Sequence, residues 1–65
     1  METIGKTQHG FTVLAINPGE ASPMLNHLGG EIAVDTETRT MYAFGVFVHL
    51  YGVDSIMRAC NSYNI

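Results

Sequence analysis

The sequence has few of the groups that cross-link a small domain or anchor it in a membrane. Its 65 residues include a single cysteine, Cys60, and no tryptophan. One thiol cannot form an internal disulfide, so we expect a reducing, intracellular setting. No apolar run of signal-peptide length lies near the N-terminus, and the longest nearly apolar run, 41–48, is far shorter than the ~20 residues of a membrane span. The sequence therefore predicts a cytoplasmic protein with no membrane partner.

Charged residues are also scarce, at 14% of the chain against ~25% in a typical domain. Three are basic, Lys6, Arg39 and Arg58, and six are acidic, so the net charge is −3. Three scattered cations do not make the clustered basic face that binds nucleic acid directly. Because 46% of the residues are hydrophobic, we expect some apolar surface to stay outside the core, where it would meet a partner or a second copy.

Motifs that specify a reaction are missing as well. The sequence has no phosphate-binding loop, no Gly-x-Ser-x-Gly and no Cys-x-x-Cys. His9, His27 and His49 are 18 and 22 residues apart, whereas zinc sites normally include one close pair of ligands. Cys60 lies among apolar residues and is expected to be a core thiol. We therefore predict no catalytic residue, no metal ligand and no cofactor; a zinc site built from the three histidines and Cys60 is the minor alternative.

The first third of the chain predicts one strand and one short helix. Residues 1–9 are polar and are expected to form a loose N-terminal arm, with a strand edge as the alternative. Residues 11–16 are β-branched and aromatic, and both alternate sets are largely apolar, which indicates a strand covered on both faces. A short helix is predicted over about 22–28, because a Ser-Pro start precedes it and a Gly-Gly pair follows. A turn at 18–21 comes before this helix.

The clearest local signal is a β-hairpin over 31–44. Two alternating segments, 31–35 and 39–44, flank the polar loop 36–38. Pairing Asp35 with Thr40 gathers one set of apolar side chains on a single face, which we predict to be buried: Ile32, Val34, Met41 and Ala43. The other face then carries Ala33, Tyr42 and Phe44 with Glu31 and Asp35.

The C-terminal third predicts a helix. Val46, Leu50, Val53, Met57 and Cys60 recur at spacings of four and three, which indicates an amphipathic helix over about 46–61 with this stripe against the sheet. Gly52 would cost ~1 kcal/mol inside such a helix. The alternative continues the strand through Leu50 and then begins a shorter helix at Asp54. We favour the long helix because the chain has little else to cover its sheet.

Together these elements predict a single small α+β domain over 1–65. Their order is strand, helix, strand, strand, helix, and the economical arrangement is a three-stranded sheet with the C-terminal helix packed on it. The candidate partner-binding residues lie on the hairpin: Glu31, Asp35, Glu37, Tyr42 and Phe44. Aromatic side chains are enriched in interface cores, and acidic side chains would steer the protein towards a basic groove.

A short, acidic α+β chain without a chemical motif resembles, in type, the small phage-encoded inhibitors of bacterial defence, anti-CRISPR proteins among them. The resemblance covers overall character and no motif, so it assigns no functional residue. It implies a non-enzymatic inhibitor in the host bacterial cytoplasm that blocks a larger protein or ribonucleoprotein complex, such as the nucleic-acid groove of a CRISPR effector. The alternative is a structural or regulatory homo-oligomer whose apolar surface is its own interface, so both monomer and homodimer stay open.

Overall fold

The computed structural model describes residues 2–20 and 26–65. Within this part of the chain the elements are β1 (Glu2–Lys6), β2 (Thr12–Ile16), the 3-10 turn η1 (Pro18–Glu20), β3 (Asn26–Leu28), β4 (Ile32–Asp35), β5 (Thr40–Phe44), α1 (Gly45–Tyr51) and α2 (Val53–Ser62). Neither α1 nor α2 has the length or the hydrophobicity needed to cross a membrane.

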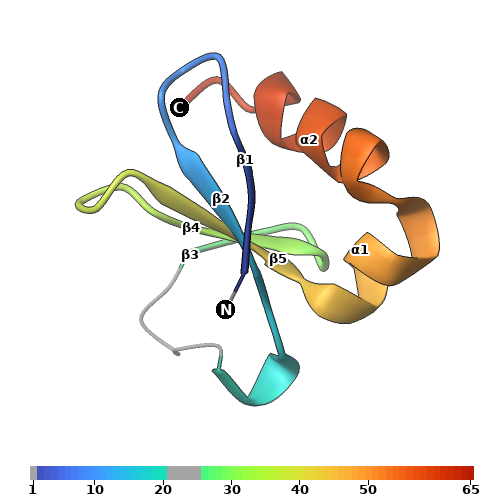
Figure 1. Cartoon of the computed structure of the whole chain (residues 1–65). Helices are drawn as coiled ribbons and strands as arrows, with labels where there is room; N and C mark the ends of the chain where they lie inside the picture. The colour runs from blue at the N-terminus through green and yellow to red at the C-terminus, as the bar shows by residue number, and fades with distance from the viewer. Residues whose placement is uncertain (1, 21–25) are drawn as a thin grey trace.

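The strands form one mixed sheet in the order β1-β2-β5-β4-β3 (Figure 1). β2 and β5 pair in parallel at its centre, and the other neighbours are antiparallel. Side chains of both helices pack against the same set of buried strand residues, so the helices cover one face of the sheet. The predicted α+β class, with the C-terminal helix on the sheet, is confirmed. The sheet is wider than the predicted three strands because β1 and β3 extend its two edges.

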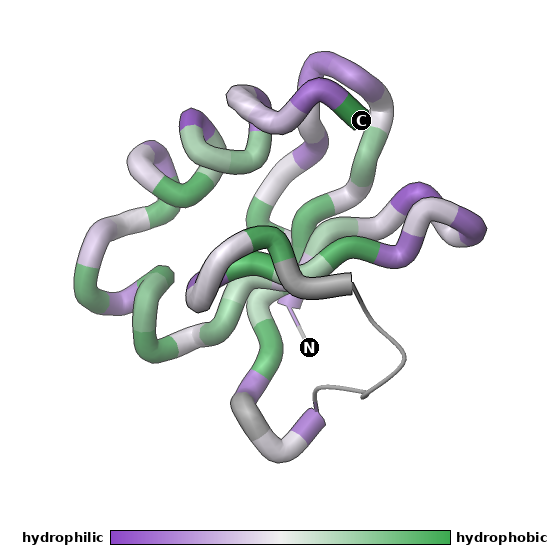
Figure 2. Tube along the Cα trace, turned by 180° about the vertical axis from the view of Figure 1, so that it is seen from behind, coloured by the Kyte–Doolittle hydropathy of each residue, from purple (hydrophilic) through white to green (hydrophobic). Residues whose placement is uncertain are grey.

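The predicted hairpin is confirmed in its register. Ile32 pairs with Ala43, Val34 with Met41 and Asp35 with Thr40. The four side chains expected on the inner face are all buried. An oxygen of the Asp35 carboxylate accepts hydrogen bonds from the backbone N–H groups of Glu37 (3.0 Å) and Thr38 (3.4 Å), which closes the loop. This hydrophilic loop projects away from the sheet (Figure 2).

Residues 2–6 are not a loose arm. They form the edge strand β1, which corresponds to the alternative considered for this segment. Thr7 and Phe11 close the β1–β2 loop through two hydrogen bonds, from the Thr7 N–H to the Phe11 carbonyl and from the Phe11 N–H to the Thr7 hydroxyl. Gln8 is bonded in turn to Asn61 at the end of α2. The arm is ordered because these long-range partners satisfy its backbone, which no local pattern in 1–9 indicates.

The helix predicted over 22–28 is wrong where the structure describes it. Residues 26–28 form strand β3, which pairs with β4; residues 22–25 lie outside the described part of the chain. The turn predicted before it is present as η1, where the Glu20 N–H donates to the Asn17 carbonyl and the Asn17 N–H donates to the Glu20 carboxylate. Strand β3 forms because it pairs with the backbone N–H and C=O groups at the edge of β4. This pairing outweighs the local helical signal.

The single long helix predicted over 46–61 is also wrong, as is the alternative strand through Leu50. The helix is broken at Gly52, whose φ of 86° and ψ of 155° lie outside the helical region. Because the chain changes direction there, the stripe predicted from residue 46 loses its phase. Val46, Leu50 and Val53 are exposed, although the prediction buries them.

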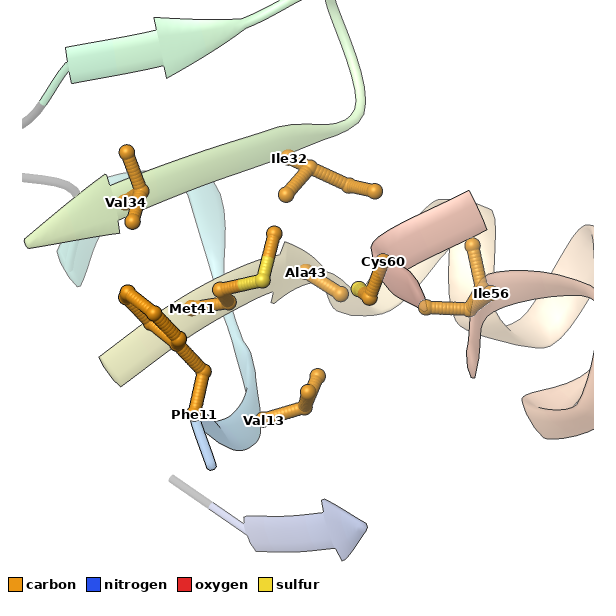
Figure 3. Close-up of a cluster of buried hydrophobic side chains, with 8 residues drawn as sticks. All are labelled: Phe11, Val13, Ile32, Val34, Met41, Ala43, Ile56 and Cys60. Atoms are coloured by element: carbon orange, nitrogen blue, oxygen red, sulfur yellow. The ribbon is translucent and has the colours of Figure 1, made fainter. Parts of the chain in front are cut away.

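The core lies between the sheet and α2 (Figure 3). It consists of Phe11, Val13, Ile32, Val34, Met41, Ala43, Ile56 and Cys60. Burial of these eight side chains supplies the main force that holds the domain together. Helix α2 also lies very close to β1: a Cβ placed on Gly5 would be 2.8 Å from the sulfur of Met57. Glycine at position 5 therefore permits this approach.

Candidate interaction surface

Four large apolar side chains along α1 and at the first residue of α2 are exposed. They are Val46, Leu50, Tyr51 and Val53, with exposed fractions of 59%, 66%, 52% and 41%. We call these four residues the corner patch. Single exposed apolar residues are common on proteins, but four within the eight residues 46–53 form a concentration of the kind that marks interaction sites.

The start of α1 explains why these side chains face outwards. The helix begins at Gly45, directly after β5, and a Cβ on that residue would be 3.5 Å from the Ile16 carbonyl oxygen. Phe47 and Val48 then pack against the core. Val46 and Leu50 lie one turn apart on another side of the helix, and α1 buries no residue completely. Figure 2 shows α1 as a largely apolar segment at the outside of the molecule.

The exposed ring of Tyr51 is held in place by the ring of Phe47. It stacks on Phe47 with ring centroids 6.1 Å apart and an angle of 6° between the planes. Phe47 in turn packs against the core. An aromatic side chain ordered in this way loses little further entropy when a partner covers it, so Tyr51 is suited to be an anchor of an interface.

The corner patch is electrically neutral. No charged residue occurs between Arg39 and Asp54, and the exposed side chains of α1 that carry a polar group are His49 and Tyr51. Cores of protein interfaces are similarly depleted of charge and rich in aromatic and aliphatic groups. The patch therefore has the chemistry of an interface centre.

The five residues predicted to bind a partner fall in separate places. Tyr42 and Phe44 share the sheet face opposite the helices and are half-buried there. Asp35 and Glu37 lie at the hairpin loop, where the Asp35 carboxylate organises the turn. Glu31 lies at the other end of β4, and one of its carboxylate oxygens is 3.6 Å from the position of a Cβ on Gly29. The two aromatic residues are brought together, but the three acids are not.

Among residues 2–20 and 26–65, ionisable groups line two hollows of the surface. One, of about 280 Å³, lies between α2 and the start of β4 and is lined by Glu31, Ile32, Tyr51, Ser55, Ile56, Ala59 and Tyr63. The other, of about 440 Å³, lies beside the start of α1, and its lining includes Glu2, Glu20 and His49. The Glu20 carboxylate in the second hollow is already bonded to the Asn17 N–H. Over residues 2–20 and 26–65, no three His, Cys, Asp or Glu side chains are grouped so as to hold a metal ion.

Cys60 is the thiol of the core, as the sequence predicts. It is 1% exposed, and this burial raises the pKa of its thiol from 9.0 to about 11. The thiol is therefore protonated at neutral pH, whereas a nucleophilic cysteine needs a thiolate. His9 and His49 are exposed.

Comparison of the chain with protein-family models, with curated proteins and with solved structures gave no match. The chemistry and exposure of the surface are therefore the basis for a functional argument. The sequence-based prediction missed the corner patch because it placed Val46, Leu50 and Val53 against the sheet, whereas all three are exposed. The signal that could have found the patch is Gly52, which interrupts the apolar stripe close to its middle.

Proposed function

We propose that this protein is a non-enzymatic binding protein that modulates a larger protein by surface contact, with the corner patch at the centre of its interface. The observation that carries the proposal is the exposure of Val46, Leu50, Tyr51 and Val53 on a domain whose core is formed without them. Apolar surface is costly to leave in water and gains most when a partner covers it.

The distribution of acids supports apolar contact over charge mimicry. Asp35 and Glu37 lie at the hairpin loop, Glu31 lies beside Gly29, and Asp54 begins α2. A mimic of nucleic acid would need its negative charges arranged on one face. The resemblance to phage-encoded inhibitors makes CRISPR effector complexes the first partners to test, and we expect the corner patch to contribute more to that contact than the acids.

The experiment compares two serine variants. Leu50→Ser removes the most exposed apolar side chain of the patch, at 66% exposure, and Ile65→Ser removes an apolar side chain at the C-terminal end that is 43% exposed. Each is co-expressed with type I or type II CRISPR effectors in a plasmid-interference assay, and binding to the purified effector is measured by calorimetry. We expect the parent and Ile65→Ser to inhibit and bind, and Leu50→Ser to bind at least about tenfold more weakly.

Oligomeric state separates this proposal from the homo-oligomer alternative. Light scattering coupled to gel filtration should show a monomer for the parent and for both variants. A parent dimer that becomes monomeric with Leu50→Ser, and not with Ile65→Ser, would identify the patch as a self-interface and contradict the proposal.

A further inference from the structure

The hollow between α2 and the start of β4, which we call the groove, has both apolar and polar lining residues. Its floor is apolar and comes from Ile32, Ile56 and Ala59. At one end the Glu31 carboxylate and the Tyr63 hydroxyl approach the same point, at 3.6 Å and 3.8 Å from a Cβ placed on Gly29. Ser55 and the exposed ring of Tyr51 also line the groove. The groove therefore combines an apolar floor with a carboxylate.

The Glu31 carboxylate is available to an incoming cation. It makes no hydrogen bond or ion pair with any residue in the described part of the chain. The Tyr63 hydroxyl is already engaged, because it donates to the Leu28 carbonyl at 3.0 Å, which fixes the ring at the end of the groove. The groove thus presents a half-buried negative charge between fixed walls.

The geometry points to an arginine side chain of a protein partner as the occupant of this groove. The methylene groups of arginine match the apolar floor, and its guanidinium can form a charge-assisted hydrogen bond to Glu31. A planar guanidinium also stacks on an aromatic ring, which Tyr51 offers. At about 280 Å³ the groove has room for a single long side chain.

The groove is continuous with the corner patch, because Tyr51 belongs to both. This inference rests on the proposed function and gives the partner a stated chemistry: an arginine flanked by apolar residues. The apolar residues would cover the corner patch while the arginine enters the groove. The arrangement resembles an interface in which one desolvated charge pair supplies specificity beside an apolar centre.

The test uses N-acetyl-arginine N-methylamide as the probe and amide NMR spectra of the full chain as the readout. We expect saturable shifts centred on Ile32, Ile56, Ala59 and Tyr63. The citrulline analogue, which has nearly the same shape without the charge, and the norleucine analogue should bind several-fold more weakly. Glu31→Gln should weaken arginine binding about fivefold, the upper range for an exposed ion pair. Glu37→Gln removes the same charge at the hairpin loop and should leave binding unchanged.

A second variant tests the groove without altering its charge. Ser55→Leu places a bulky side chain on the α2 wall and should abolish the shifts while the spectrum stays that of a folded protein. Three results would overturn the inference. The first is that the norleucine analogue binds as tightly as the arginine analogue. The second is that Glu37→Gln, and not Glu31→Gln, weakens arginine binding. The third is that the groove resonances of the free protein shift with protein concentration and that this shift disappears in Arg58→Gln. The last would assign the groove to a second copy.

The same variants separate this inference from the proposed function. Loss of effector binding in Leu50→Ser, with no arginine binding at the groove, would leave the proposed function standing and reject the groove. If arginine binding depends on Glu31 and Leu50→Ser leaves effector binding unchanged, the groove inference stands and the proposed function is rejected.

Discussion

Helices α1 and α2 follow one another across a single residue, Gly52, and have opposite relations to the core. Helix α2 contains Asp54 and Arg58, and yet it buries Ile56 and Cys60 completely. Helix α1 has no charged residue and buries none of its side chains completely. The more hydrophobic of the two helices is thus the more exposed. This difference is the basis of our proposal that the apolar surface of α1 makes a contact outside the domain.

The largest expected effect is the difference in stability lost when one apolar side chain is truncated in each helix. Ile56→Ala removes a side chain that is 3% exposed and should lower the free energy of unfolding by about 2–5 kcal/mol. Leu50→Ala, at 66% exposure, should change it by less than about 0.5 kcal/mol. Urea denaturation followed by circular dichroism measures both. Equal losses in the two variants would mean that Leu50 belongs to the core.

The next effect concerns the break between the helices. Gly52 has a φ of 86°, which an L-residue adopts only with strain, so Gly52→Ala should destabilise the protein by about 1–3 kcal/mol. In one continuous helix the same change would stabilise it by ~1 kcal/mol. The sign of the shift in denaturation midpoint therefore distinguishes two helices from one, and Gly19→Ala, with open space around its Cβ position and no positive φ, serves as the control.

A smaller effect is the difference in alkylation rate between a thiol in α2 and a thiol in α1. Because burial raises the pKa of Cys60 to about 11, alkylation of this thiol at pH 8 should be more than about a hundredfold slower than alkylation of a thiol introduced by Leu50→Cys on a Cys60→Ala background. The rate at Cys60 should rise as the pH approaches 11. Alkylation of native Cys60 as fast as of the introduced thiol would show that α2 does not cover it.

The same pKa predicts how stability depends on pH. The folded-state pKa lies above the unfolded value of 9.0, so the neutral thiol contributes its full stability below pH 9. That contribution should be lost as the pH rises from 9 to about 11. Cys60→Ala should lack this decline, and a parent protein whose stability is flat over the same range would contradict the assignment.

The hairpin could be predicted to the residue from the sequence, and the helical region could not. Alternation over 31–44 has a period of two, and pairing Asp35 with Thr40 fixes every other pair. The stripe through Val46, Leu50 and Val53 is just as regular, but it presumes an unbroken helix. Gly52, the single glycine of residues 46–61, resets the phase by its positive φ, and sequence spacing does not reveal that it adopts this conformation.

The two edge strands were missed for a different reason. Strand β1 depends on pairing with β2, and β3 depends on the free edge of β4, so neither is determined by its own residues. The predicted binding residues Tyr42 and Phe44 share a face as expected, because that follows from the hairpin register. The corner patch and the Glu31 groove were not predicted, because the prediction treated Gly52 as a residue inside one continuous helix.

The most direct test of the central claim measures the solvent exposure of individual methyl groups. A soluble paramagnetic agent added to methyl-labelled protein at low micromolar concentration broadens the resonances of groups that water reaches. We predict strong broadening for the methyl groups of Val46, Leu50 and Val53, and little for those of Val13, Ile32 and Ile56, in accordance with their exposure. Protection of Leu50 to the same degree as Ile56 in the monomeric protein would contradict the account, because the corner patch would then be part of the core.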